Sequence, residues 1–101
     1  MLEDEIFKKY TVDWNLLVSY GFIKEEKGYR YVRNQVPGFK AIVFVFKDGH
    51  VKGTIWDTAL DEEYVNYRIE SQNGTFVSEI REAYIALLKD IREHCFKETP
   101  F

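Results

Sequence analysis

The chain has 101 residues, a formal net charge of −3, and 46% hydrophobic and 17% aromatic residues. This length suits one compact domain, and the large apolar fraction excludes intrinsic disorder. No apolar stretch approaches the roughly 20 residues of a membrane helix, and the acidic start is unlike a signal peptide. We therefore expect one cytoplasmic domain over residues 1–101, without a membrane span. The lone Cys95 fits a reducing compartment, because it has no partner for an internal disulfide.

Charge is distributed unevenly along the chain. Residues 1–23 carry a net charge of −2, and residues 24–52 carry seven basic against three acidic side chains, a net charge of +4. Residues 53–101 carry five basic against ten acidic side chains, a net charge of −5. A basic middle segment can attract an anionic partner, although uneven surface charge is also common in folded domains.

Two short helices are expected at the start of the chain. Residues 2–9 place Leu2 and Ile6 on one side of a helix and acidic side chains in its first turn. Asp13 is a suitable N-terminal cap for a second helix over residues 14–20, and Gly21 is a suitable stop.

From Phe22 the hydrophobic period changes to that of strands. Segments 22–24 and 29–33 flank a short loop, and segments 39–47 and 50–57 are joined by Asp48-Gly49, which favours a two-residue turn. This turn predicts that Phe44 lies opposite Gly53. The expected core face holds the bulky residues Ile42, Phe44, Phe46, Val51 and Ile55, and the expected outer face holds Ala41, Val43, Val45, Lys47, His50, Lys52, Thr54 and Trp56.

A fourth strand and a long helix complete the expected fold. Residues 65–70 alternate apolar and polar side chains, which predicts a strand, and Asn73 or Thr75 can cap the helix that follows. An apolar stripe on that helix is expected to pack on the face of Ile42, and residues 97–101 are expected to fray. The stripe consists of Phe76, Val77, Ile80, Tyr84, Leu87, Leu88 and Ile91. The fold class is therefore α+β: two short N-terminal helices, an antiparallel meander of about four strands, and a long C-terminal helix on one face.

The sequence supplies no recognisable catalytic, metal or cofactor site. His94 and Cys95 are adjacent, but neighbours on a helix point in different directions, so we expect a solvated His94 and a small buried Cys95. Two distant histidines and one cysteine match no zinc spacing, and the scattered glycines form no phosphate-binding loop. These patterns favour a non-enzymatic domain without metal or cofactor.

One anion site is conceivable at the start of the long helix, where backbone N–H groups point outward. It would use Arg68, Ser71, Gly74, Thr75 and Arg81. Helix capping alone also explains these residues, and we favour that explanation.

The hairpins suggest two kinds of partner. A protein partner or a second copy would bind the outer sheet face around Trp56, Val43 and Val45. Alternatively, the basic hairpins over residues 24–52 would bind nucleic acid, weakly and without sequence preference, because the chain as a whole is acidic. The side chains on the expected partner or nucleic-acid face are Arg30, Tyr31, Arg33, Lys47, His50, Lys52 and Trp56.

A family resemblance is carried by the string Glu-Ser-Gln-x-Gly-x-Phe-Val at residues 70–77, followed by Arg81-Glu82, and it extends from residues 5–7 to residues 95–96. On these residues the chain resembles the N-terminal module of larger YjbR-family, or MmcQ-like, proteins. Proteins of that family are commonly described as DNA-binding, because their YjbR domain has a winged α+β architecture. The resemblance implies that this chain stops about where that second domain would begin, and it brings no catalytic residues.

Overall fold

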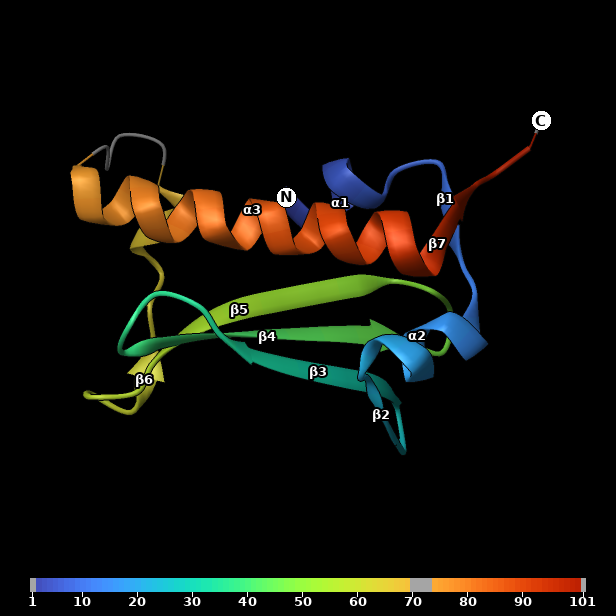
Figure 1. Ribbon diagram of the computed structural model, residues 1–101, viewed down its shortest axis with the longest axis horizontal. Coiled ribbons are helices and arrows are strands. Elements are labelled where there is room, and N and C mark those ends of the chain that lie inside the picture. Colours follow the sequence, from blue (N-terminus) through green and yellow to red (C-terminus); the bar gives the residue numbers. More distant parts are fainter. Residues whose placement is uncertain (1, 70–73, 101) are drawn as a thin grey trace.

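The computed structural model describes residues 2–69 and 74–100 and confirms the α+β class (Figure 1). Its helices are α1 (Leu2–Phe7), α2 (Trp14–Tyr20), the 3₁₀ turn η1 (Asn66–Arg68) and α3 (Thr75–Cys95). Its strands are β1 (Tyr10–Val12), β2 (Ile23–Glu25), β3 (Gly28–Asn34), β4 (Phe39–Phe46), β5 (Val51–Asp57), β6 (Glu62–Glu63) and β7 (Phe96–Glu98).

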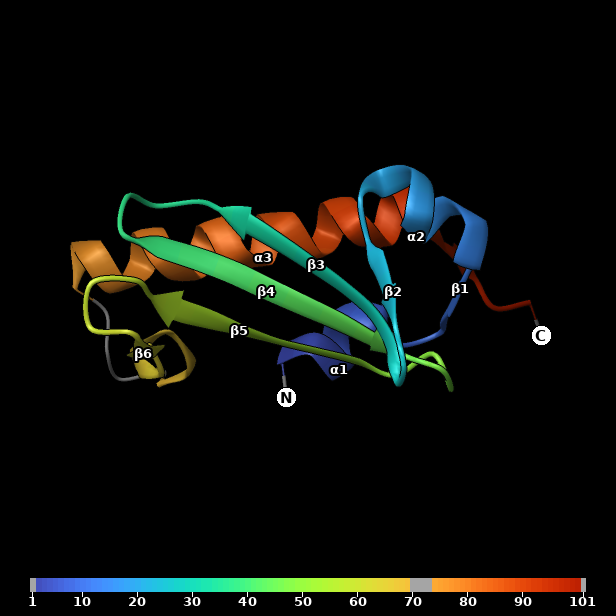
Figure 2. The same cartoon turned by 90° about the horizontal axis from the view of Figure 1, so that it is seen from below.

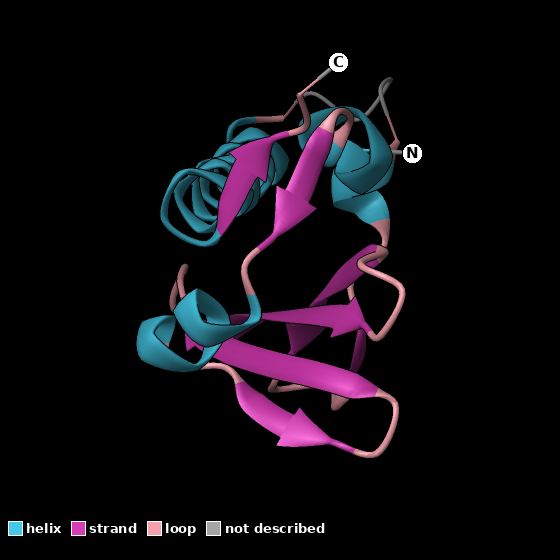
Figure 3. Cartoon of the chain, turned by 90° about the vertical axis from the view of Figure 1, so that its right-hand side faces the viewer, coloured by secondary structure: helices cyan, strands magenta, loops and turns pink. Residues whose placement is uncertain are grey.

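The main sheet is an antiparallel meander in the order β2-β3-β4-β5-β6, and helices cover one of its faces. Figure 2 shows the sheet in front of α3, which runs along its length. In Figure 3, where α3 is seen nearly end-on, the sheet lies entirely to one side of that helix. This is the layered arrangement expected when a single helix covers an antiparallel sheet.

The N-terminal helices form where the sequence predicts them. The side chain of Asp13 accepts hydrogen bonds from the backbone N–H groups of Asn15 and Leu16, which confirms it as the cap of α2. The helix ends at Gly21, and Leu17 on its inner side is fully buried. The first helix ends earlier than expected, at Phe7, and Tyr10 belongs to strand β1.

The turn between β4 and β5 is longer than predicted. The backbone N–H of Phe46 donates to the carbonyl of His50, so three residues, Lys47 to Gly49, form the loop. Gly49 has a φ of 90°, which suits the left-handed position that ends a three-residue hairpin loop. The prediction of a two-residue turn is therefore wrong by one residue.

That single residue exchanges the two faces of β4, because side chains alternate along a strand. Val43, not Phe44, lies opposite Gly53. Ala41, Val43 and Val45 are fully buried against the helices, whereas Ile42, Phe44 and Phe46, the predicted core face, point away from them. The assignment of Val51 and Ile55 to the core is confirmed.

The segment after β5 also differs from the prediction. No strand forms over residues 65–69, where η1 occupies Asn66–Arg68 instead, and residue 70 lies outside the described residues. The two-residue strand β6 pairs with Trp56 and Asp57 and forms the edge of the sheet. The side chain of Tyr67 is 1% exposed, and its ring packs edge-on against the ring of Tyr84.

Helix α3 presents most of its predicted stripe to the core. Ile80, Tyr84, Leu87, Leu88 and Ile91 are buried. Phe76 is half-exposed and contacts the rings of Phe39 and Tyr64 at one end of the sheet. The N-terminal cap is Gly74, without a side-chain hydrogen bond, so Thr75 is not the cap; Asn73 lies outside the described residues.

Residues 97–99 are held by pairing, which corrects that part of the predicted frayed tail over residues 97–101; residue 101 lies outside the described residues. Strand β7 pairs with β1, placing Val12 opposite Phe96 and Tyr10 opposite Glu98. The backbone N–H of Thr99 then donates to the carbonyl of Lys9. This small second sheet ties the end of α3 to the segment between the first two helices.

Candidate interaction surface

The face of the sheet that turns away from the helices is a broad, mixed apolar and charged surface. We call it the outer face. The cross-strand pairs place the even-numbered residues of β3, β4 and β5 on it, together with odd-numbered residues of the two edge strands. Its members are Ile23, Glu25, Arg30, Val32, Asn34, Lys40, Ile42, Phe44, Phe46, Lys52, Thr54, Trp56 and Glu63.

Apolar groups on this face remain in contact with water. Ile23 is 70% exposed and Val32 is 47% exposed, while Ile42, Phe44 and Phe46 are partly buried. Exposed apolar side chains on the uncovered face of a small domain, set among charged ones, are typical of an interface.

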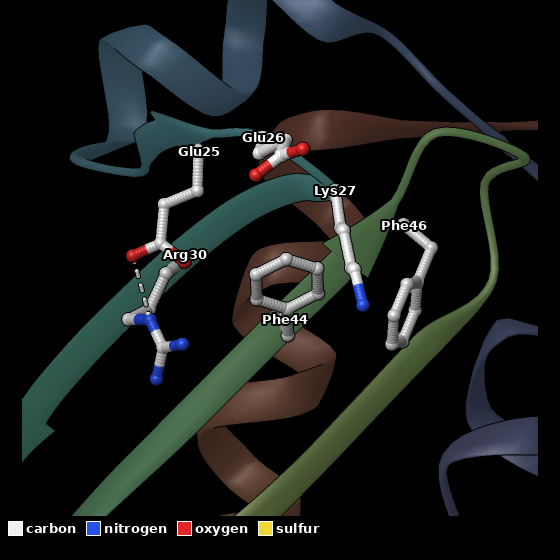
Figure 4. Close-up of a pocket in the computed structure, with 6 residues that line it drawn as sticks. All are labelled: Glu25, Glu26, Lys27, Arg30, Phe44 and Phe46. Carbon is white, nitrogen blue, oxygen red and sulfur yellow. Dashed lines mark hydrogen bonds and ion pairs between the residues drawn. The ribbon is translucent and has the colours of Figure 1, made fainter.

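An open hollow of about 420 Å³ lies at the hairpin end of the outer face. Figure 4 shows the rings of Phe44 and Phe46 beside Lys27, with Arg30 and Glu25 along one side. The two rings meet edge to face, with centroids 4.7 Å apart, and the Arg30 guanidinium lies 5.5 Å from the Phe44 centroid. Arg30 also pairs with Glu25 at 2.8 Å. The hollow therefore offers aromatic contact area with charges of both signs at its rim.

The two ends of the molecule below α3 carry opposite charge. The hairpin end, where both long hairpins turn, has a net charge of +2, and the opposite end, around β6, has a net charge of −3. The hairpin end holds Lys24, Lys27, Arg30, Lys47 and Lys52 against Glu25, Glu26 and Asp48, and the β6 end holds Asp57, Asp61, Glu62 and Glu63 against Lys40. At the acidic end the Trp56 indole N–H donates to the carboxylate of Asp61 at 3.1 Å.

The structure divides the residues that the sequence assigned to a partner face. Arg30, Lys52 and Trp56 lie together on the outer face. Lys47 and the exposed His50 lie at the hairpin end, where His50 contacts the Phe46 ring. The assignment of Val43 and Val45 to this face is wrong, because both are buried beneath the helix.

Tyr31 and Arg33 lie on the opposite side of β3, against α2. The Arg33 side chain donates to the hydroxyls of Tyr31, at 2.8 Å, and Tyr20, at 3.2 Å. The Tyr20 hydroxyl donates to Asp90 at 2.6 Å, and burial together with this bond raises the pKa of Tyr20. These contacts join α2, β3 and α3, so Arg33 is engaged within the molecule.

A buried polar cluster that the sequence did not reveal joins α1 to α3. Glu3 is 2% exposed, and its carboxylate accepts from both terminal nitrogens of Arg68 and from the hydroxyl of Tyr84. Burial alone would raise the pKa of Glu3, but the bonds from Arg68 and Tyr84 outweigh it and hold that pKa below its ordinary value. The one sequence signal is that Glu3 lies three residues before Ile6, on the inner side of the helix.

The same cluster explains why position 53 holds a glycine. A Cβ at this position would overlap the Tyr84 hydroxyl, and the Gly53 carbonyl accepts from Arg68 at 2.6 Å. Every oxygen of the Glu3 carboxylate has a partner. Glu3, Arg68 and Tyr84 thus bond to one another and join segments that are distant in the sequence. We call these three residues the clasp.

The two arginines of the conceivable anion site point elsewhere. Arg68 is engaged with Glu3, and Arg81 donates to the carbonyls of Tyr67 and Ile69. Gly74 and Thr75 are exposed at the start of α3, and Ser71 lies outside the described residues. The two arginines thus stabilise the segment before α3, and the anion site remains a sequence prediction.

His94 and Cys95 take the positions expected of them. His94 is exposed and its ring lies 2.8 Å from the carbonyl of Asp90, while Cys95 is fully buried, with its thiol facing the carbonyl of Leu16. Burial raises the pKa of the Cys95 thiol to about 11. Within residues 2–69 and 74–100, no group of His, Cys, Asp and Glu could hold a metal ion, and no helix is long and apolar enough to cross a membrane.

Comparison of the chain with protein-family models, with curated proteins and with solved structures finds no match in any of the three. The outer face is thus characterised by its own geometry: an uncovered sheet surface of apolar and charged side chains with an aromatic hollow at its hairpin end.

Proposed function

We propose that this protein is a non-enzymatic interaction domain that binds another protein surface through the outer face. The observation that carries the proposal is the uncovered sheet, where exposed Val32 and Ile23 adjoin the half-buried rings of Phe44 and Phe46. Aromatic side chains and arginine are the residue types enriched at protein interfaces. The resemblance to a YjbR-family N-terminal module suggests the setting, as an accompanying module of a YjbR-like protein.

The buried ionisable groups support a binding role over a catalytic one. Glu3, Arg68 and Tyr84 bond to one another, and the raised pKa of Cys95 keeps its thiol protonated near neutral pH. Catalytic groups in contrast must reach a substrate in a cleft. The hollow at the hairpin end is lined by Phe44, Phe46 and exposed charged side chains, a set typical of recognition.

Nucleic-acid binding is the second candidate, favoured by one arrangement. Arg30 lies over the Phe44 ring and Lys52 lies opposite Phe44 on the neighbouring strand, so stacking and phosphate contacts could be combined there. Glu25 neutralises part of this charge by pairing with Arg30. Because phosphate neutralisation dominates nucleic-acid affinity, we place this role second, as weak and non-specific binding.

Photo-crosslinking tests the proposal in cells that naturally produce the chain. A photoreactive amino acid replaces Val32 on the outer face, and a matched control places it at Lys89, exposed on α3. We expect protein adducts from position 32 and none from position 89. Equal labelling from both positions, or no adduct from position 32, would refute an interface on the outer face.

A further inference from the structure

The last part of β3 carries backbone groups that the sheet does not use. Odd-numbered residues of this strand bond to β4, and the backbone N–H of Gln35 continues the pattern by donating to the carbonyl of Phe39. The N–H and C=O groups of the even-numbered residues therefore point to the other margin of the strand. Ile23 is the last residue of the chain to pair with that margin. Val32 and Asn34 lie beyond it, and no backbone group of the described residues bonds to theirs.

The chain turns away from this open margin. Figure 2 shows β2 beside the first part of β3 only, and the two strands diverge towards the arrowhead of β3. The residues before β2 belong to the end of α2, because the N–H groups of Gly21 and Phe22 bond to the carbonyl of Leu17. Val32 and Asn34 are both exposed. An extended segment can therefore reach their N–H and C=O groups.

Arg33 lies between these two residues, and its charge lacks a carboxylate partner. It points to the inner side of the sheet, where its guanidinium donates to the hydroxyls of Tyr20 and Tyr31. Both hydroxyls are neutral near pH 7, and no Asp or Glu of residues 2–69 and 74–100 forms an ion pair with Arg33. In a strand added beside β3, the residue opposite Arg33 points to the same side. An acidic residue there would supply the missing carboxylate.

We infer that an extended acidic segment of a partner protein pairs with this part of β3 as an added antiparallel strand. Such pairing is a recurrent mode of peptide recognition, in which main-chain hydrogen bonds supply affinity and neighbouring side chains supply specificity. The segment bonds to the N–H and C=O of Val32 and of Asn34. The inference rests on the proposed function, because Val32 belongs to the outer face, and it names the kind of segment that binds there.

Arg33 also argues against a second copy of this chain as the occupant. If the open parts of two β3 strands paired antiparallel about a two-fold axis, Val32 of one copy would face Asn34 of the second, and Arg33 would face Arg33. Like charges directly opposite each other in a sheet are unfavourable. An inward-pointing charge on an edge strand is one device by which proteins prevent edge-to-edge association. The open margin therefore favours a partner of opposite charge at this position.

The two outer-facing positions complete the expected pattern of the segment. A β-branched side chain opposite Val32 covers its exposed methyl groups, and a polar one suits Asn34. Along an antiparallel segment the pattern therefore runs polar, acidic, β-branched. Because the open margin is short, an isolated peptide should bind with a dissociation constant of about 1 mM.

Amide hydrogen exchange, followed by NMR on the full chain, tests this pairing. The probe is the capped peptide Ser-Ser-Thr-Glu-Val-Ser, added to about 5 mM, with its valine opposite Val32. One control peptide carries an N-methyl group on that valine, which removes the N–H that donates to the carbonyl of Val32. A second carries the N-methyl group on the glutamate, whose N–H points away from β3. A third has lysine in place of the glutamate.

We expect the amide protons of Val32 and Asn34 to exchange about sixfold more slowly, the factor for about 5 mM peptide and a dissociation constant of about 1 mM. The amides of Tyr31 and Arg33, which already bond to β4, should not change. N-methylation of the valine should abolish the slowing, and N-methylation of the glutamate should preserve it. Lysine in place of the glutamate should weaken binding by about threefold or more.

Two variants of the protein make the same test from the other strand. Val32→Pro removes the N–H that points to the open margin, and proline is tolerated at such edge positions. Val32→Thr keeps both the N–H and the branched shape. Circular dichroism checks that both variants fold, and the amide of Asn34 reports binding. The proline variant should lose the slowing at Asn34, and the threonine variant should keep it.

Four results would overturn the inference. Unchanged exchange at Val32 and Asn34, or equal slowing by the two N-methylated peptides, excludes backbone pairing. Equal binding of the glutamate and lysine peptides excludes an acidic partner, and slowing that appears when the protein is concentrated without peptide identifies a second copy as the occupant. The photo-crosslink from position 32 tests the proposed function separately. Protein adducts without peptide pairing refute only the added strand, whereas the absence of adducts refutes the interface itself.

Discussion

The two faces of one sheet differ in nearly every property. The inner side of β4 carries Ala41, Val43 and Val45, which are fully buried under α3, and Phe39 at its start, which contacts Phe76. The outer side of the same strand carries Phe44 and Phe46, larger apolar side chains that remain partly exposed. Over residues 41–46 the smaller side chains are inside and the larger ones outside, the reverse of what size alone suggests.

The helix explains this inversion. Tyr84 fills the space above Gly53, where a Cβ would overlap its hydroxyl, so the sheet needs small residues beneath α3. Large residues on the outer face have no such constraint, and their apolar area is left for another surface to cover. The covered face therefore determines the fold, and the outer face is the region available for function.

The largest expected effect is a contrast in stability between the two faces. Leu88, on the inner side of α3, is fully buried in the core, so Leu88→Ala should lower the free energy of unfolding by about 2 to 5 kcal/mol. Val32 is 47% exposed, and Val32→Ala should cost about 1 kcal/mol or less. Urea unfolding at low protein concentration measures both without a contribution from association. Equal losses would mean that the outer face contributes to the core.

The second-largest expected effect is the loss of stability when the clasp, on the covered side of the sheet, is broken. Glu3→Gln leaves the partly buried Arg68 without its counter-charge, and we expect a loss of about 2 to 3 kcal/mol in the free energy of unfolding. Glu5→Gln changes an exposed residue of the same helix and should stay within about 0.5 kcal/mol of the wild type. Chemical unfolding at neutral pH measures both, and a similar small loss for both variants would contradict a structural role for the clasp.

The pH dependence of this difference has a definite sign. Because the pKa of Glu3 is lowered in the folded state from its ordinary value of 4.5, its contribution is fully present above pH 4.5. It is lost as the pH falls through the lower, folded-state pKa. The stability difference between the wild type and Glu3→Gln should therefore shrink on acidification. A difference that is constant down to pH 3 would show that protonation of Glu3 carries none of the effect.

Local signals in the sequence were sufficient for most of the longer elements but not for the faces. Asp13, Gly21 and the strand periods over residues 22–57 identify α2 and strands β2 to β5, because capping and alternation act over a few residues. The alternation over residues 65–70 misled, because η1 forms at Asn66–Arg68 instead of a strand. The face of β4 depended on whether the turn before His50 has two or three residues. Asp48-Gly49 is compatible with both, and one residue inverts the whole strand.

Contacts between distant segments were beyond sequence reasoning for a related reason. The pairing of β1 with β7 and the clasp of Glu3 with Arg68 join residues more than 60 positions apart. No local pattern specifies such pairs. The candidate site was predicted in part: Arg30, Lys52 and Trp56 share the outer face. Tyr31 and Arg33 lie on the inner side because side chains alternate along β3, and there Arg33 donates to the hydroxyls of Tyr20 and Tyr31.

Thiol reactivity provides a second contrast, between the buried core that holds Cys95 and the outer face. Cys95 is fully buried and its pKa is raised from 9.0 to about 11, so its thiolate fraction at neutral pH falls about a hundredfold below that of an ordinary thiol. In Val32→Cys, the new thiol on the outer face should be alkylated at least that much faster. Peptide mass spectrometry after timed iodoacetamide treatment distinguishes the two sites. Rapid, selective alkylation of native Cys95 would contradict its burial and reopen a chemical role.

Nucleic acid should produce the smallest effect. The hairpin end of the molecule carries a net charge of only +2, and acidic residues at the β6 end oppose a phosphate backbone. We expect a dissociation constant of roughly 10⁻⁴ M or weaker near physiological salt, with affinity that falls steeply as salt rises. Fluorescence anisotropy of labelled single-stranded and duplex DNA, at low and near-physiological salt, measures this.

A pair of charge-matched variants decides whether any such binding uses the outer face. Arg30→Glu with Lys52→Glu reverses two outer-face charges, and Lys89→Glu with Lys97→Glu makes the same net change at exposed positions elsewhere. If binding only reports net charge, both double variants lose the weak affinity equally. Binding tighter than micromolar near physiological salt, abolished by the outer-face variant and kept by the other, would show that Arg30 and Lys52 recognise phosphates despite Glu25 and Glu63. In that case Glu25 and Glu63 would lower the affinity for phosphates only slightly. Nucleic acid, rather than a protein surface, would then be the principal ligand of the outer face.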